Sequence, residues 1–324
     1  MSTPLHEDLG QDTRLVDCRL YRPALAACYL VRDGDELALI DCGTRHSLPQ
    51  ILEAIAAMGG SPEQVRWIIP THVHLDHAGG AGVLMQHCPH ATLVTHPRGV
   101  PHMIDPSRLQ AGATAVYGEA AFARDFGQLE PISEERCIAA EDGQAFALGG
   151  RELRFYHTPG HANHHGCILD SASGWLFTGD TFGLGYRELA IPSPYIVATT
   201  TPVAFDPEAW QHSLDRLLAL EPSAVCLTHY GKYEDPSDLA PMLRNSIQAH
   251  VEIALAEESN NTEGREERLY ETVKRLLVDG AMAHTGLPRE RIAPLLDNDA
   301  RLNAQGLAVW LARRAKRRQE QKSD

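Results

Sequence analysis

Short blocks of apolar residues, separated by polar turn-forming residues, fill most of the first 180 positions of the chain. Blocks of four to eight apolar or alternating residues are typical of strands. The pattern predicts early strands at residues 14–21, 26–32, 36–42, 65–70 and 91–96. Residues 47–60 instead carry apolar side chains at helical spacing. Ser47 is suited to the N-cap and Gly59-Gly60 to the stop, so we expect a helix there.

A second group of strands follows a mostly helical stretch that includes residues 79–87 and reaches about residue 125. The expected strands of this group cover residues 145–150, 152–160, 165–170, 174–180 and 223–229. An amphipathic helix is predicted at 206–220, before the last of them. Two groups of strands, each with helices, predict two sheets packed together with helices outside, which is an α/β (α+β) architecture.

The pattern changes near residue 235, after which nearly all of the chain is predicted to be helical. Residues 259–266, SNNTEGRE, are the most linker-like segment. We therefore divide the chain into an α/β part, 1–235, and a helical C-terminal region, 236–324. The basic run at 311–322 is interpreted as a solvated helix end, where cations are favourable.

Composition narrows the classes of protein. Hydrophobic residues make up 43% and charged residues 22% of the 324 positions, as in ordinary globular proteins. The net charge of −14 disfavours a nucleic-acid partner, because phosphate contacts need clustered Lys and Arg. No apolar run approaches the ~20 residues that span a bilayer, so we expect no membrane insertion. The polar N-terminus lacks the apolar core of a signal peptide, and the seven cysteines form no CxxC pair. Both features favour a cytoplasmic protein with reduced thiols.

Candidate chemistry is concentrated directly after the strand at 65–70. The run Thr71-His72-Val73-His74-Leu75-Asp76-His77 places three imidazoles and one carboxylate within six positions. Side-chain direction repeats every two residues in extended chain, so His72 and His74 share one side. Imidazoles and carboxylates are ligands for zinc, iron or manganese. The run therefore predicts a metal site.

Three further candidate ligands stand at predicted strand ends. His161 closes His157-Thr158-Pro159-Gly160-His161, where Pro159-Gly160 forces a sharp turn. Asp180 ends Thr178-Gly179-Asp180, and Gly179 permits a close backbone approach. His229 ends the strand predicted at 223–229, after the apolar run AVCLT. Functional groups tend to gather at such ends.

Residues 20–235 resemble the metallo-β-lactamase superfamily in the HxHxDH run and in the order of the later ligands. The resemblance implies a four-layer αββα sandwich and a site for two metal ions. It also implies that 1–235 is the catalytic domain and that the helical C-terminal region, 236–324, covers the active site. It assigns His72, His74 and His161 to the first ion, and Asp76, His77 and His229 to the second, with Asp180 bridging both. Asp41 matches the family's carboxylate that orients a ligating imidazole.

Two metal ions predict hydrolysis, because they can share a bridging hydroxide that attacks a carbonyl or phosphoryl centre. Asp76 and Asp180 are the expected catalytic carboxylates, which position the hydroxide. The chain contains no G-x-S-x-G sequence, the motif that would indicate a serine nucleophile. Zinc is the expected metal, with iron and manganese as alternatives that accept the same ligands.

The substrate is a separate question. The HTPGH and FTGD sequences resemble those of glyoxalase II-like thioesterases, so we expect a small-molecule thioester such as an acyl-CoA or related acyl-thiol. The context of the last ligand, Leu227-Thr228-His229-Tyr230-Gly231, departs from that of glyoxalase II and argues against glutathione thioesters. A lactonase or ester hydrolase is the alternative, and a di-iron redox or sensor protein is the alternative from another class. The sequence leaves open whether the chain forms a homodimer.

Residues 183–201 form the longest stretch without clear periodicity, and they follow Asp180 closely. We expect this segment to line the substrate pocket through Tyr186, Arg187 and Tyr195. His157 is interpreted as a polar residue whose hydrogen bonds are satisfied rather than as a ligand. His164 and His165 fit no ligand position and are interpreted as loop residues.

Overall fold

The structure is a computed structural model that describes residues 4–200 and 204–321. The chain forms two compact units. The first contains residues up to 158, 164–179 and 221–234. The second contains residues 159–163, 180–220 and those from 235 onward. The chain passes between the units at several points, one of which lies between residues 234 and 235. Residues 159–163 and 180–220 precede this point in the sequence but belong to the second unit.

The first unit contains a seven-stranded sheet in which the strands follow chain order. Its strands are β1 (His6–Gly10), β2 (Thr13–Asp17), β3 (Ala27–Asp33), β4 (Glu36–Ile40), β5 (Val65–Ile69), β6 (Thr92–Thr95) and β7 (Cys137–Ala139). Strands β1 to β4 pair antiparallel, and β4 to β7 pair parallel. The parallel pairs matter for function because the chain leaves each of these strands at the same edge of the sheet.

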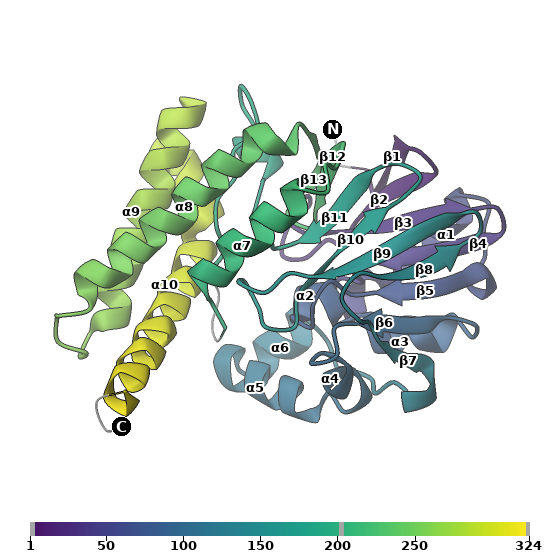
Figure 1. Ribbon diagram of the computed structural model, residues 1–324, viewed down its shortest axis with the longest axis horizontal. Coiled ribbons are helices and arrows are strands. Elements are labelled where there is room, and N and C mark those ends of the chain that lie inside the picture. The colour runs from purple at the N-terminus through teal and green to yellow at the C-terminus, as the bar shows by residue number, and fades with distance from the viewer. Residues whose placement is uncertain (1–3, 201–203, 322–324) are drawn as a thin grey trace. The chain divides into compact units, whose positions relative to one another are not determined.

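The first unit also contains a six-stranded sheet, with its strands in the order β13-β12-β11-β10-β9-β8. Its strands are β8 (Gln144–Leu148), β9 (Arg151–His157), β10 (Gly166–Asp170), β11 (Trp175–Gly179), β12 (Ala224–Leu227) and β13 (Gly231–Glu234). Only β11 and β12 are parallel among the neighbours described in this sheet. Figure 1 shows the purple and teal strands of the two sheets.

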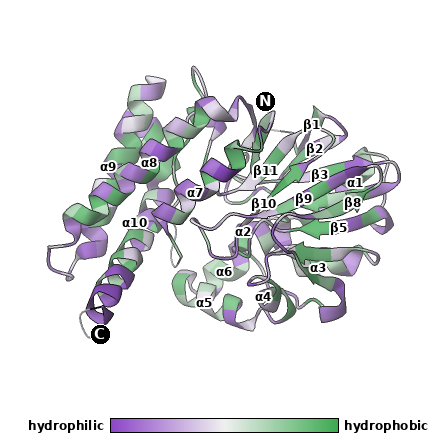
Figure 2. Cartoon of the chain, viewed as in Figure 1, coloured by the Kyte–Doolittle hydropathy of each residue, from purple (hydrophilic) through white to green (hydrophobic). Residues whose placement is uncertain are grey.

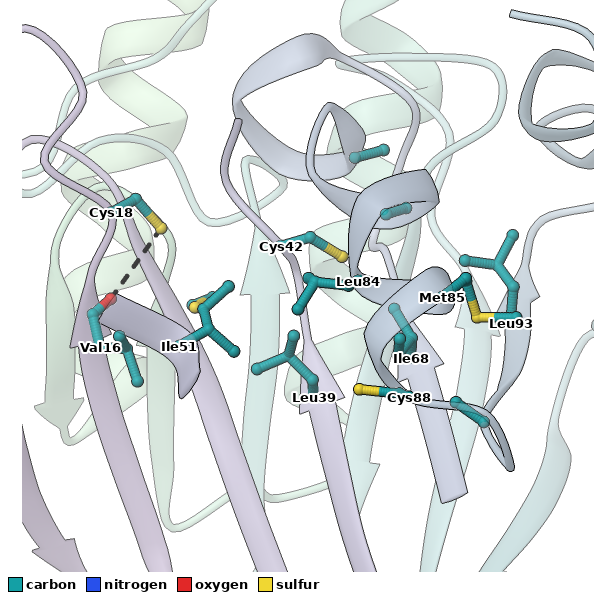
Figure 3. Close-up of a cluster of buried hydrophobic side chains, with 14 of the residues drawn as sticks. Val16, Cys18, Leu39, Cys42, Ile51, Ile68, Leu84, Met85, Cys88 and Leu93 are labelled. Carbon is teal, nitrogen blue, oxygen red and sulfur yellow. Dashed lines mark hydrogen bonds between the residues drawn. The ribbon is translucent and has the colours of Figure 1, made fainter. Parts of the chain in front are cut away.

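Successive side chains of a strand point to opposite faces of the sheet, and this alternation gives the unit two hydrophobic cores. On β3, Tyr29 and Val31 join a cluster shared with Phe155 and Phe177 of the second sheet. Cys28 and Leu30, which point the opposite way, join a cluster formed with helix residues. Figure 3 shows part of this second cluster, with Leu39 and Ile68 of the sheet facing Ile51 and Leu84 of the helices. The sheets therefore pack face to face, and helices cover the outer face of the first sheet.

The helices of the first unit are short. They are α1 (Leu48–Ala57), α2 (Leu75–Ala78), α3 (Ala81–His87), α4 (Val100–Ile104), α5 (Ser107–Tyr117) and α6 (Glu119–Asp125). Short 3-10 turns occur at Arg45–Ser47, Pro62–Gln64 and Glu134–Arg136. Helix α1 ends before Gly59, whose φ of +69° is left-handed, as expected for a glycine stop.

The second unit is mainly helical. It contains a 3-10 turn at Arg187–Leu189 and the helices α7 (Pro207–Leu218), α8 (Pro236–Glu257), α9 (Arg265–Thr285) and α10 (Arg289–Glu320). The predicted linker at 259–266 connects α8 to α9. None of the helices in the described ranges is long and apolar enough to cross a membrane.

The basic run at 311–321 forms the end of α10, as predicted, while residue 322 of that run lies outside the described residues. Arg314 and Arg318 both pair with Glu258, at 2.9 and 3.0 Å. The last turns of this helix are hydrophilic in Figure 2. These contacts account for the run as a structural helix end.

Two sequence predictions need correction. The strand predicted at 14–21 ends at Asp17, because the Asp17 carboxylate accepts hydrogen bonds from the backbone N–H groups of Arg19 and Ala24 and turns the chain into a loop. Strands β1, β7 and β13 were not predicted. All three are short and partly exposed, so they carry little apolar pattern.

Candidate metal centre

The HxHxDH run begins three residues after β5 ends, at the edge where the parallel strands release the chain. Asp41 directly follows β4, the parallel neighbour of β5. His229 lies two residues beyond β12 in the second sheet. Three separate strand ends therefore supply the polar groups of the first unit, as expected for groups carried by connecting segments on a rigid sheet.

Asp41 is the buried centre of this arrangement. Its Oδ1 accepts hydrogen bonds from the backbone N–H of Thr71 at 2.7 Å and from Thr71 Oγ1 at 2.9 Å. Its Oδ2 accepts from Thr228 Oγ1 at 2.6 Å and lies 2.8 Å from His77 Nδ1. The carboxylate thus favours the His77 tautomer with the proton on Nδ1, which directs Nε2 away from Asp41 as a potential metal ligand.

Asp76, His77 and His229 offer ligand atoms that lie within 4.8 Å of one another. Asp76 Oδ2 is 3.6 Å from His77 Nε2 and 3.2 Å from His229 Nε2. His229 Nδ1 lies 2.6 Å from the carbonyl oxygen of Leu25. Both imidazoles therefore have Nδ1 held by an oxygen acceptor and Nε2 directed toward the same carboxylate.

His72 and His74 also face one another within the first unit. His72 Nε2 is 2.8 Å from His74 Nδ1, and Thr71 Oγ1 lies 3.1 Å from His72 Nδ1. His165 packs on the other side of His72, with ring centroids 4.7 Å apart and planes 29° apart. Its own Nδ1 is 2.9 Å from Thr158 Oγ1. His165, interpreted from sequence as a loop residue, is thus fully buried against a candidate ligand.

The second unit holds the other two candidate ligands. His161 Nε2 is 3.3 Å from Asp180 Oδ2, and His161 Nδ1 is 2.9 Å from the carbonyl oxygen of Thr199. Trp210 of α7 connects the segments that carry them. Its ring packs 5.9 Å from that of His161, and its indole N–H donates to the carbonyl oxygen of Thr181 at 2.6 Å.

Two glycines make these strand ends possible. Gly179 has a φ of +48°, and a Cβ there would lie 2.5 Å from Thr71 Oγ1 and 2.6 Å from His165 Nε2. Gly160 has a φ of +141°, and a Cβ there would lie 2.4 Å from the Trp210 backbone. The sharp turn predicted at Pro159-Gly160 and the close approach predicted at Gly179 both agree with this geometry.

The chemistry of the donors fits divalent metal ions. His77, His229 and His161 share one arrangement, in which Nδ1 meets an oxygen acceptor and Nε2 meets a carboxylate oxygen. Imidazole nitrogen and carboxylate oxygen suit zinc, iron and manganese. An acceptor on the outer nitrogen is the usual partner of a metal-ligating histidine.

The neighbouring residues have structural roles. Cys42 is fully buried, and burial followed by the nearby Asp41 charge raises the pKa of its thiol well above the usual value. His157 Nε2 lies 2.9 Å from the carbonyl oxygen of Ala140, which agrees with a satisfied polar residue. His164 lies close to His72 and His74, with ring centroids 6.1 and 5.7 Å away.

The segment predicted to line the substrate pocket packs within the second unit, apart from Thr201, which lies outside the described residues. Tyr186 is buried and donates from its hydroxyl to Asp299 Oδ1 at 3.1 Å. Tyr195 packs on His284, with ring centroids 5.0 Å apart, and burial raises its pKa to about 12. Arg187 is exposed. The substrate role of these three residues stays a prediction.

Comparison with known proteins matches residues 21–229 to the metallo-beta-lactamase superfamily. The chain belongs to the metallo-beta-lactamase superfamily. The predicted fold is thereby confirmed, as an α/β sandwich of two mixed sheets with a helical C-terminal region. As a member of this superfamily with His and Asp metal-binding groups, the chain is a hydrolase that binds metal.

Several relatives of this superfamily member are informative. A metallo-beta-lactamase fold-containing protein of Sulfurisphaera tokodaii is 28% identical over 71% of this chain and 84% of its own length. An atrochrysone carboxyl ACP thioesterase of Aspergillus fumigatus is 30% identical, over 47% of this chain and 38% of the relative. A solved metallo-beta-lactamase family protein from Thermus thermophilus covers 95% of both chains with a TM-score of 0.65 and 21% identity, which shows the fold.

Proposed function

We propose that the chain is a thioester hydrolase whose seven predicted ligands hold two divalent ions, with zinc as the native metal. The observation that carries this proposal is the arrangement shared by three ligand imidazoles, those of His77, His161 and His229, each with an outer acceptor and an inner carboxylate. Chain connections support the grouping of all seven, because Asp180 is bonded directly to the last residue of β11, and His161 lies four residues beyond β9. A thioesterase among the relatives supports the substrate class.

The seven predicted ligands would form two sets, one for each metal ion. His72, His74 and His161 would hold one ion, and Asp76, His77 and His229 the other, with Asp180 between them. When bound, such ions lower the pKa of water and stabilise the oxyanion of an attacked carbonyl. Asp41 and the carbonyl oxygens of Leu25 and Thr199 keep three imidazoles in the ligating tautomer.

Asp76 and Asp180 would orient the attacking water and accept its proton. Hydrolysis forms a bond from the water oxygen to the acyl carbon and breaks the bond from that carbon to sulfur. The products are a carboxylic acid and a thiol. A thiolate leaves readily, so this substrate class makes small demands on a general acid.

The test uses purified, zinc-loaded protein and measures thiol release from acyl-CoA and acyl-N-acetylcysteamine thioesters. We expect turnover that falls at least a hundredfold in Asp180→Ala but stays unchanged in His212→Ala. His212 is a matched control because it is an exposed histidine on α7, and its Nδ1 lies 2.8 Å from the carbonyl oxygen of Glu208 in the same helix. Activity on lactones or phosphodiesters alone would overturn the thioester assignment.

A further inference from the structure

Exposed apolar side chains gather at one place on the first unit. Tyr21, Val116 and Tyr117 are 52, 65 and 36% exposed, and they account for three of the five large exposed hydrophobic residues among those described. The rings of Tyr21 and Tyr117 both pack on buried Phe126, with centroids 6.4 and 5.2 Å from it. We call Tyr21, Val116, Tyr117 and Phe126 the aromatic surface. Contiguous exposed apolar groups usually mark a binding site.

Backbone bonds connect the aromatic surface to the metal ligands within the same unit. Leu25, whose carbonyl oxygen contacts His229 Nδ1, lies on the loop that carries Tyr21. The backbone N–H of Arg45 donates to the carbonyl oxygen of Phe126 at 3.2 Å. The same segment joins the ligand turn, because the N–H of Cys42 donates to the carbonyl oxygen of His77 at 2.7 Å. These backbone bonds connect the aromatic surface to the chain segments that carry His77 and His229.

Electrostatics agrees with this placement. Burial raises the pKa of Tyr117 to about 12, and the carboxylate of Asp76 adds to the rise. The pKa of Tyr21 is raised as well, first by burial and then by Tyr117, Asp125 and Asp76. The negative charge of Asp125 next to the rings disfavours an anionic ligand group at this position.

The loop that presents Tyr21 is strained. Arg19, Tyr21 and Ala24 have φ values of +56°, +54° and +56°, a region that costs non-glycine residues about 1 kcal/mol or more each. The buried Asp17 carboxylate holds the loop through the N–H groups of Arg19 and Ala24. Strain maintained by such contacts is concentrated at functional sites.

We propose that the aromatic surface binds the neutral, apolar acyl or aryl group of the substrate. The assignment rests on the proposed ester or thioester hydrolysis. If this surface binds the acyl group, kcat/KM rises with the size of that group, because burying each added methylene stabilises the bound state by about 0.8 kcal/mol at most.

The test compares acetyl, butyryl, octanoyl and benzoyl thioesters of one thiol. In the wild type, kcat/KM is expected to rise at least tenfold from acetyl to octanoyl or benzoyl, and Tyr117→Ala and Tyr21→Ala should remove most of this rise through KM. Leu255→Ala is the matched control, an exposed apolar residue on α8.

Equal chain-length preference in wild type and both variants would overturn the aromatic surface as a binding site. Absence of turnover on every thioester and ester in the wild type would instead overturn the proposed function.

A separate observation concerns Asn303 in the middle of α10. This buried side chain contacts both residues that flank Thr199, the residue whose carbonyl oxygen faces His161 Nδ1. Asn303 Oδ1 accepts from the N–H of Thr200 at 2.7 Å, and Nδ2 donates to the carbonyl oxygen of Ala198 at 3.1 Å. Its second amide hydrogen is directed at His250 Nε2, 3.2 Å away.

The geometry points to Asn303 as a positioning residue for the ligand His161. By holding the backbone on both sides of Thr199, its amide fixes the carbonyl that keeps the His161 proton on Nδ1. The backbone N–H of Ala198 also donates to Ser246 Oγ at 2.9 Å, which secures the same segment from α8.

The test measures zinc affinity by chelator competition and the His161 tautomer by imidazole nitrogen NMR, neither of which uses a substrate. Asn303→Leu is expected to weaken the binding of one zinc ion by about 10- to 100-fold and to mix the His161 tautomers. Gln305→Leu, on the same helix, is the control. Asn303→Ala replaces Asn303→Leu if that protein does not fold. Wild-type affinity and a single tautomer in the folded Asn303 variant would overturn the inference.

Discussion

At the scale of single residues, Asp41 shows how the sequence turns a histidine-rich run into a metal site. One buried carboxylate accepts from Thr71, Thr228 and His77, residues that come from two different sheets of the same unit. A lone buried carboxylate would be costly, and these donors offset that cost. The same contacts orient His77 before any metal binds.

Asp41→Asn tests this role, because the amide replaces one acceptor oxygen with a donor that must face either Thr71 or the pair Thr228 and His77. We expect zinc affinity to fall by about 10- to 100-fold, as measured by competition with a chromogenic chelator. Asp33→Asn, which changes a carboxylate that accepts from the backbone of Gly150, should leave the affinity unchanged. Equal affinity in Asp41→Asn and the wild type would contradict the role.

A comparison of Gly179→Ala with Gly143→Ala separates the cost of backbone strain from the cost of a steric clash. Gly143 has a φ of +79°, and a Cβ there would have nothing within 4 Å, whereas a Cβ at Gly179 would clash with Thr71 and His165. We expect Gly143→Ala to lower the free energy of unfolding by about 1 kcal/mol. Gly179→Ala should lower it by about 3 kcal/mol or more. Urea unfolding measures both, and equal losses would contradict the close approach at Gly179.

The ligand types could be predicted from sequence, and their supporting partners could not. His72 to His77 form a dense pattern of ligand residues, and His161, Asp180 and His229 each follow an apolar block. By contrast, the acceptors for His229 and His161 are the backbone carbonyls of Leu25 and Thr199, which leave no signal in residue type. Asn303 and Tyr117 are distant in sequence from every ligand, so only the fold reveals them.

At the scale of elements, strands that are buried on both faces were predicted well, whereas three of the four edge strands, β1, β7 and β13, were missed. β11 and β12, which read WLFTG and AVCL, are buried throughout, and the first five residues of β3 form a buried run. β1 and β13 read HEDLG and GKYE, because an edge strand need not be apolar. The loop after β2 was predicted as strand because its apolar alternation continues to Tyr21, past the turn that Asp17 imposes.

The helices of the second unit carry a testable pH dependence through His250 of α8. Burial lowers the pKa of this fully buried imidazole to about 4, while an unfolded histidine has a pKa near 6.5. Between these values the unfolded chain binds more protons, so stability falls as the pH drops from about 6.5 to about 4. The loss approaches about 3 kcal/mol.

Urea unfolding between pH 7 and pH 4.5 measures this slope. His250→Gln, which can still accept from Asn303, should make the slope shallower. Part of the slope should persist, because burial also lowers the pKa of His96 to about 4. An unchanged slope in His250→Gln would show that His250 does not titrate as described.

At the scale of the whole molecule, the chain passes several times between the two units, and the predicted ligands are divided between them. Five ligands belong to the first unit, and His161 and Asp180 belong to the second. Metal bound by these ligands should stabilise the folded form of the chain. A ligand at 100 times its dissociation constant adds about 2.7 kcal/mol.

Thermal unfolding with and without a chelator measures this stabilisation. We expect the melting temperature to fall on metal removal, to recover when zinc is added back, and to respond less in His229→Ala than in His212→Ala. Identical responses in the two variants would show that the stabilising metal binds elsewhere.

The most direct test of the central claim is the number of metal ions bound per chain. Equilibrium dialysis against zinc, followed by elemental analysis, should give two ions per chain for the wild type and for His212→Ala, and at most one for Asp180→Ala. Equal zinc content in Asp180→Ala and the wild type, or no more than one ion in the wild type, would contradict a two-metal centre built on these seven residues.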